Sequence, residues 1–336
     1  MVYFVQMPEF MPFPIVDLHC DLLSYLAKIP NASPFATEDI ACAFPHLING
    51  NVRLQICAIY TDVRPSSMDL GWKQAVIFRE LIEKESTSFM EFDGENLAPS
   101  EKVGIMASIE NAAGIGHEDA SWKEIYEQFD RILEKTGKLA YISLTHHTEN
   151  RFGGGNYTEG IGLKDDGKKL LDYMSGKKIP IDLSHTSDLL AEGILTHIKK
   201  ENLSIPVIAS HSNYRAIWDH KRNLSDEFAQ EIIIQKGIIG VNFLRAFLDN
   251  DVPDRLYEHI LHGFEIGGEE AQCFGADFFY TLDFPDPNRF PFYFPLAENS
   301  GKYPAILEAL QANLEQSSLE KLAYKNALNF YQNLYR

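Results

Sequence analysis

The sequence predicts an α/β fold in which eight parallel strands close into a TIM-like (β/α)8 barrel. Eight short apolar or alternating runs are bounded by turn-forming residues, and longer segments with helical periodicity separate most of them. Strands that alternate with helices in this way pair in parallel. No Gly/Ser-rich linker or internal repeat divides the 336 residues, so we expect one barrel domain over 1–336. Periodicity alone leaves a doubly wound open sheet as the alternative.

The apolar runs and the periodic segments place each expected element. Strands are expected at 15–19, 52–60, 103–109, 139–144, 179–183, 206–210, 238–243 and 272–276. Helices are expected at 71–88, 121–136, 165–176, 187–200, 225–236, 254–265, 303–313 and 318–334. The glycine-rich segment 151–162 and the segment 284–295, rich in proline and aromatic residues, are predicted loops because neither can continue as regular structure. Loops that follow barrel strands line the active face.

Composition narrows the partners that this chain can have. The 48 acidic and 30 basic residues give a formal charge of -18, which repels phosphate backbones and anionic lipid, so neither nucleic acid nor membrane is an expected partner. Four scattered cysteines without a C-x-x-C pair fit a reducing compartment. No secretory signal pattern or run of eighteen apolar residues is found, so a cytoplasmic, unanchored protein is expected.

Ionisable residues stand where the predicted strands end. In chain order these residues are Asp17, His19, Asp21, Glu110, His146, His147, His185, His211 and Asp277. One such residue alone more often caps a helix or makes a satisfied polar contact. The carboxyl ends of barrel strands meet on one face, however, so we expect the set to gather there. Strict alternation would turn His147 to the opposite face from His146.

Part of this set has the chemistry of a metal site. His19 and Asp21 are two residues apart, so an extended backbone points both side chains the same way. Zinc favours imidazole with carboxylate in hydrolytic sites, and neighbouring strands bring His185 and His211 together for a second ion. Glu110 could bridge the two. Two cations about 3.5–4 Å apart can deprotonate a water and polarise a carbonyl, so the residues predict a hydrolase site.

An ordered series of motifs extends over residues 15 to 334. It consists of VDLHCDLL, ASIEN, SLTHHTEN, GLKDDG, IDLSHTS, PVIASHSNYRAI, HKRNLSD, GVNF, GADF and SGKYPAILEAL. DLSHTS followed by PVIASHS is the specific part of the series. At these residues the chain resembles the membrane dipeptidases, peptidase family M19, which are binuclear zinc enzymes built on a barrel of the metal-dependent hydrolase type. The resemblance implies a catalytic barrel and two divalent ions, zinc first among them.

The resemblance also implies roles for individual residues. His19 and Asp21 would bind the first zinc ion, Glu110 would bridge, and His185 and His211 would bind the second. His146 would contact the substrate carbonyl, Arg222 would pair with the C-terminal carboxylate of the substrate, and Asp277 would shuttle the proton. The implied reaction is hydrolysis of small dipeptides by a metal-bridging hydroxide, with tolerance for a D-residue at the C-terminal position. Family members are often dimers, which leaves a homodimer open.

Other interpretations stay open at this stage. The same binuclear site could hydrolyse a cyclic amide or a β-lactam, and a barrel that only binds metal or peptide is a second alternative. Asn242 either lines the substrate pocket or caps the next helix. The chain departs from the family after Asp277, where Phe279 and Tyr280 replace the usual Asp-Gly, so the floor beneath the substrate side chain is expected to differ.

Overall fold

A barrel of parallel strands organises the structure, a computed structural model that describes residues 13–282 and 284–336. Hydrogen-bonded neighbours follow the order β7-β6-β5-β4-β2-β1-β9-β8, and each ladder on this path is parallel. These strands are β1 (Ile15–Cys20), β2 (Val52–Tyr60), β4 (Val103–Glu110), β5 (Leu139–Ser143), β6 (Ile181–Asp182), β7 (Val207–Ile208), β8 (Ile239–Val241) and β9 (Gln272–Phe274).

The two end strands of this order come together and nearly close the barrel. Ala209, just after β7, pairs with Ile239 of β8 in a parallel bridge, and the Gly240 N–H donates to the Ala209 carbonyl over 2.8 Å. Gly240 and Gly275 both approach Ser210 so closely that a Cβ on either would lie 2.0 Å from the Ser210 carbonyl oxygen. The predicted (β/α)8 barrel is confirmed, and the open doubly wound sheet is wrong.

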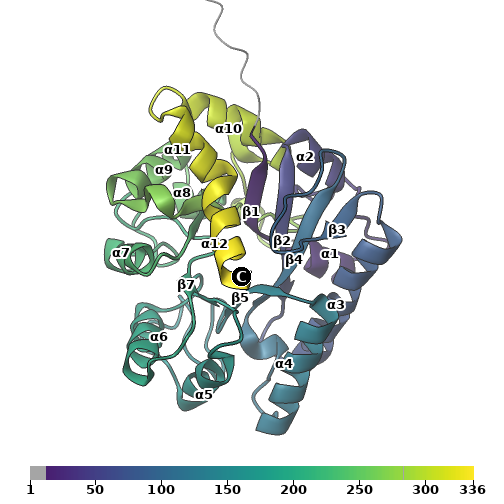
Figure 1. The fold of residues 1–336 in the computed structure, drawn as a ribbon, viewed down its shortest axis with the longest axis vertical. Helices are drawn as coiled ribbons and strands as arrows, with labels where there is room; N and C mark the ends of the chain where they lie inside the picture. The colour runs from purple at the N-terminus through teal and green to yellow at the C-terminus, as the bar shows by residue number, and fades with distance from the viewer. Residues whose placement is uncertain (1–12, 283) are drawn as a thin grey trace, which may run out of the picture.

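Helices surround the strands (Figure 1). They are α1 (Leu22–Lys28), α2 (Phe44–Asn49), α3 (Ser67–Lys84), α4 (Trp122–Thr136), α5 (Asp165–Met174), α6 (Asp188–Glu201), α7 (Asp226–Ile234), α8 (Arg245–Leu248), α9 (Arg255–Glu265), α10 (Tyr303–Leu310), α11 (Gln316–Glu320) and α12 (Asn326–Tyr335). Local sequence explains where α4 begins, because Ser121 and Glu124 form a capping box at its first turn.

The structure differs from the expected elements in three ways. The predicted helix over 71–88 ends at Lys84, and the chain then forms a ninth strand, β3 (Phe89–Glu91), beside β4. The helices α1, α2 and α8 were not predicted, because segments of four to seven residues are too short to show helical periodicity. The helix expected over 318–334 is interrupted by a π-helical turn at Lys321–Lys325.

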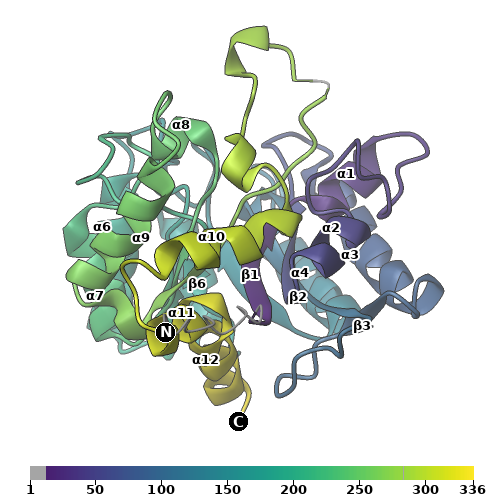
Figure 2. The ribbon, with the colours of Figure 1, turned by 90° about the horizontal axis from the view of Figure 1, so that it is seen from above.

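One end of the barrel is closed by the last helix. Val16 and Leu18 of β1 belong to an apolar cluster that also contains Ala327 and Tyr331 of α12. Figure 2 shows the loop after β9 projecting at the opposite end from α12. The carboxyl ends of the strands therefore remain available for a site.

In the part of the chain that the structure describes, no helix combines the length and the apolar character needed to cross a membrane. The cytoplasmic location and the homodimer stay predictions.

Candidate metal centre

Glu110 stands at the centre of a group of buried histidines. This carboxylate ends β4, and its Oε1 lies 2.9 Å from His185 Nε2, 3.5 Å from His211 Nε2 and 3.7 Å from His146 Nε2. The two nitrogens of His185 and His211 are themselves 3.0 Å apart. His185 follows β6 and His211 follows β7, so three separate strand ends deliver these side chains to one place.

The other carboxylate oxygen of Glu110 faces a second group. Glu110 Oε2 lies 3.5 Å from His19 Nε2, which in turn is 3.8 Å from Asp21 Oδ2 and 3.6 Å from Asp277 Oδ1. His19, Asp21 and Asp277 together form a group with the spacing of metal ligands, as do His19, Glu110 and His211. The structure thus brings all five predicted metal ligands together, with Glu110 between the two groups.

Hydrogen bonds on the far side of two imidazoles set their tautomers. The Tyr141 hydroxyl donates to the Leu18 carbonyl over 3.1 Å, so it accepts from His19 Nδ1 over 2.6 Å. The Ser210 hydroxyl likewise donates to Asp182 over 2.7 Å and accepts from His211 Nδ1 over 2.6 Å. Both assignments leave the Nε2 lone pair of His19 and of His211 facing Glu110, which is the orientation a metal ligand needs.

The donor atoms fit a cation for two further reasons. His19 Nε2 and Asp21 Oδ1 are buried without a hydrogen-bond partner in the described chain, although buried polar atoms are normally paired. Burial lowers the pKa of His185 and of His211 well below the usual value, and the nearby Arg222 acts in the same direction. Both imidazoles are therefore neutral, the form that binds a metal ion.

A bulge in β1 lies at the first two candidate ligands, His19 and Asp21. Asp17 pairs with Gln55 and Cys20 pairs with Cys57, so three steps along β1 match two along β2. The Asp17 carboxylate accepts from the His19 N–H and the Ala276 N–H, both over 3.1 Å, and from the Tyr303 hydroxyl over 2.6 Å. Asp17 therefore supports β1 beneath the site through these three hydrogen bonds.

Asp277 is held by its neighbour Asn242. The Asn242 side-chain amide donates to Asp277 Oδ2 over 2.8 Å, and its carbonyl accepts from the Leu244 N–H over 2.7 Å. Burial raises the pKa of Asp277 to about 7, against the lowering influence of His19. Its φ of 64° is unusual for a residue with a side chain, and His185 at 69° shares this strain. A carboxyl group with such a pKa can both take up and release a proton near neutrality.

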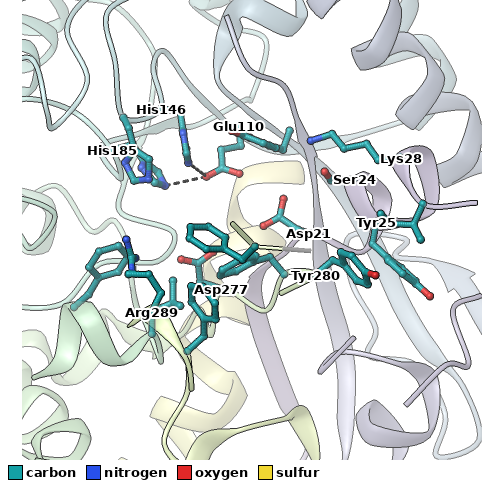
Figure 3. A pocket seen from close by; sticks show the side chains of 18 of the residues that line it. Asp21, Ser24, Tyr25, Lys28, Glu110, His146, His185, Asp277, Tyr280 and Arg289 are labelled. Atoms are coloured by element: carbon teal, nitrogen blue, oxygen red, sulfur yellow. Dashed lines mark ion pairs between the residues drawn. The ribbon is translucent and has the colours of Figure 1, made fainter. Parts of the chain in front are cut away.

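These residues border a cavity of about 430 Å³ (Figure 3). Its lining includes the proposed ligands Asp21, Glu110 and His185, together with His146 and Asp277. Both predicted loops contribute, through Tyr157 from 151–162 and through Phe292 and Arg289 from 284–295. The remaining lining residues are Ser24, Tyr25, Lys28, Ile29, Tyr60, His147, Leu244, Phe247, Phe279, Tyr280 and Phe284.

His147 lies elsewhere than expected, and two other candidate residues lie outside the cavity lining. His147 lines the cavity beside His146, with ring centroids 3.9 Å apart, because β5 ends at Ser143 and the chain then bends, so strand alternation no longer applies. Arg222 is buried and donates to Ser212 Oγ and to the His211 carbonyl, both over 3.0 Å. Neither Arg222 nor Asn242 is among the described residues that line the cavity.

Sequence reasoning missed several residues of the site. Tyr60 lines the cavity and ends the expected strand 52–60, so its strand-end position was the same signal that singled out the candidate ligands. Lys28 gave no such signal, because α1 was not expected. Tyr141 and Tyr303 touch His19 and Asp17 only in the folded chain.

Removal of the Tyr141 hydroxyl should weaken metal binding. We expect Tyr141→Phe to lower the affinity for zinc by about 10- to 100-fold, because the variant loses the acceptor that orients His19. A competitive titration against a coloured chelator measures this change. Tyr173→Phe, which removes a surface hydroxyl bound to Asp130, is the matched control. Equal zinc affinity for Tyr141→Phe and the unmodified protein would contradict the role of Tyr141.

The barrel, with histidines and carboxylates converging at its strand ends, defines a metal-dependent hydrolase of the TIM-barrel class. The model of the membrane dipeptidase family, peptidase family M19, matches residues 10–334. The chain therefore belongs to peptidase family M19, as its motifs predicted, and is a metallodipeptidase by class.

Individual proteins resemble the chain over most of its length. An uncharacterized protein in the pqqA 5' region of Klebsiella pneumoniae is 27% identical over 288 residues, which cover 80% of this chain and 97% of that protein. Among solved structures, dipeptidase AC, a metallopeptidase of family M19, has a TM-score of 0.77 at 20% identity and covers 96% of this chain and 98% of its own. A metallopeptidase from Rhodobacter sphaeroides, liganded with a phosphinate mimic of L-Ala-D-Ala, has a TM-score of 0.78 at 18% identity and covers 96% and 99%. The solved structures share the fold.

Proposed function

We propose that this chain is a binuclear zinc dipeptidase that hydrolyses small dipeptides. The observation that carries the proposal is the position of Glu110, whose two carboxylate oxygens face His19 on one side and His185 with His211 on the other. A carboxylate between two sets of donors is the arrangement that a shared ligand requires. Buried donor atoms without partners on His19 and Asp21 support the same conclusion.

His19 and Asp21 would hold one cation, His185 and His211 the other, and Glu110 both. When bound, the two ions supply Lewis-acid polarisation of the scissile carbonyl and lower the pKa of the attacking water.

The protein side chains have separate tasks in this proposal. His146 is the residue placed to donate a hydrogen bond to the substrate carbonyl, since it lines the cavity and its Nε2 reaches within 3.7 Å of Glu110. Asp277 takes the proton of the attacking water and gives it to the leaving amine. Asn242 keeps Asp277 in place through its 2.8 Å hydrogen bond. Arg222 supplies positive charge beside the site for the C-terminal carboxylate of the substrate.

The cavity suits a short peptide. A volume of about 430 Å³ is at the small end of ligand pockets. The Rhodobacter sphaeroides relative was crystallised with a mimic of L-Ala-D-Ala, which supports tolerance for a D-residue at the C-terminal position. Because Asp277 delivers a proton and no side chain of the site is needed as a nucleophile, either configuration at that position leaves the scissile carbonyl accessible.

Metal removal tests the proposal. We expect dialysis against a chelator to abolish hydrolysis of a panel of dipeptides, and two equivalents of zinc per chain to restore it. Elemental analysis of the restored protein counts the ions, and cyclic amides and a β-lactam are assayed beside the dipeptides. Activity that survives complete metal removal would contradict the metal centre. Turnover of the cyclic amides that is faster than turnover of the dipeptides would favour a cyclic-amide hydrolase over a dipeptidase.

A further inference from the structure

One end of the cavity carries a lysine, Lys28. Lys28, in the last turn of α1, lines the cavity and has no carboxylate within ion-pair distance among residues 13–282 and 284–336. The sequence carries 48 acidic against 30 basic residues. What distinguishes Lys28 from the other lysines without an ion pair is its place at the cavity wall, where its charge can act on a bound substrate.

The Tyr60 ring connects Lys28 to His146 and sets an upper limit on the distance between them. Lys28 Nζ lies 4.7 Å from the centre of the Tyr60 ring, and that ring is 4.8 Å from the His146 ring. The two distances together keep the ammonium within 9.5 Å of the residue proposed to bind the scissile carbonyl. The ring contacts continue from His146 to His147 and from His147 to Tyr157.

Ser24 adds a hydroxyl to the same wall. Ser24 and Lys28 are four residues apart on α1, so they share one face of the helix, and both line the cavity. Figure 3 shows the two side chains next to each other above Asp21. An ammonium and a hydroxyl side by side are suited to hold a carboxylate.

The other end of the cavity carries its own cations. Arg289 lines that end, between the rings of Phe284 and Phe292 at 5.6 and 5.7 Å, and Figure 3 shows it across the cavity from Lys28. Arg222 lies 5.4 Å from the Phe247 ring, which also lines the cavity. In the proposed function the C-terminal carboxylate of the dipeptide occupies this end, so the side chain of the N-terminal residue extends toward Lys28.

We propose that Lys28, with Ser24, selects dipeptides whose N-terminal residue has a carboxylate side chain. The inference rests on the proposed dipeptidase function and specifies its substrate class. A glutamate side chain places its carboxylate far enough from the scissile carbonyl to span most of the gap between His146 and Lys28. The Lys28 ammonium, which pairs with no carboxylate of residues 13–282 and 284–336, would then neutralise the charge of that side chain.

Matched substrates test this selection. L-Glu-L-Ala and L-Gln-L-Ala have the same shape and differ in one charge, so the ratio of their kcat/KM values isolates the contribution of that charge. We expect the zinc-loaded enzyme to prefer L-Glu-L-Ala by about tenfold, the scale of one charge-assisted contact. Lys28→Met should reduce this ratio to near one. In Lys28→Glu the ratio of the two kcat/KM values should fall below one. This variant should also hydrolyse L-Lys-L-Ala in preference to L-Glu-L-Ala.

The control is Lys199→Met, which removes an exposed lysine on α6, remote from the cavity lining, and should keep the tenfold ratio. Raising the salt concentration should lower the ratio in the unmodified enzyme, because ions screen the contact. Hydrolysis of both peptides at equal kcat/KM, or a tenfold ratio that persists in Lys28→Met, would overturn the selection and leave the dipeptidase proposal intact. Failure to hydrolyse any dipeptide would overturn both.

Discussion

Glu110→Gln is expected to lower kcat on dipeptides by at least about a thousandfold, which makes it one of the two most damaging single changes in the site. The two oxygens of the carboxylate lie 2.9–3.7 Å from four imidazoles, and the amide of glutamine can use only one oxygen as a ligand. The variant should therefore hold fewer metal ions than the unmodified protein. Steady-state kinetics and elemental analysis, applied to the same preparation, measure both effects.

The control for this change is Glu83→Gln, which alters an exposed glutamate on α3 and should leave kcat and metal content unchanged. Because glutamine has nearly the same shape as glutamate, the barrel of Glu110→Gln should remain folded, and circular dichroism checks this. Two tightly bound zinc ions and ordinary turnover in Glu110→Gln would show that Glu110 does not join the two groups of donors.

Asp277→Asn should keep the metal ions and lose turnover, by about 10²- to 10⁴-fold in kcat. The amide can still accept the hydrogen bond from Asn242, so the position of the side chain is preserved. What the variant lacks is a group that can take up a proton at neutral pH. The dipeptide should still bind, so KM is expected to change far less than kcat.

Metal content decides between two roles for Asp277. The carboxylate lies 3.6 Å from His19 Nε2 and forms a group with His19 and Asp21 that has ligand spacing. If Asp277→Asn binds one ion fewer, Asp277 is a metal ligand. If turnover is unchanged, Asp277 has no part in the reaction. Asp119→Asn, an exposed change before α4, provides the comparison for expression and folding.

The strand-end pattern explains why so much of this site could be predicted from the sequence. In a parallel barrel the carboxyl end of each strand reaches the same face, so a histidine or carboxylate directly after an apolar run has its location determined by topology. His19, Glu110, His185 and His211 all satisfy this condition, and the structure brings them within a few ångströms of one another.

The parts that could not be predicted depend on contacts between distant segments. Tyr303 reaches Asp17 across 286 positions of the chain, and Tyr141 reaches His19 across 122. Neither contact produces a pattern in the sequence around these residues from which it could be predicted. Lys28 lies on a helix of seven residues, too short for a periodic signal, and the bend after β5 reversed the expected side of His147. Short elements and bends are decided by packing, which periodicity does not record.

The support beneath β1 has a consequence for the order in which the site can form. Asp17 is near the start of the described chain, yet two of its three hydrogen bonds come from Ala276 and Tyr303. A ribosome that has released only the first two hundred residues has already made His19, Asp21 and Glu110, but not the groups that anchor the strand carrying the first two. The site can therefore become active only after nearly the whole chain has been translated. A chain that stops after about two hundred residues should be inactive, even though it contains most of the candidate ligands.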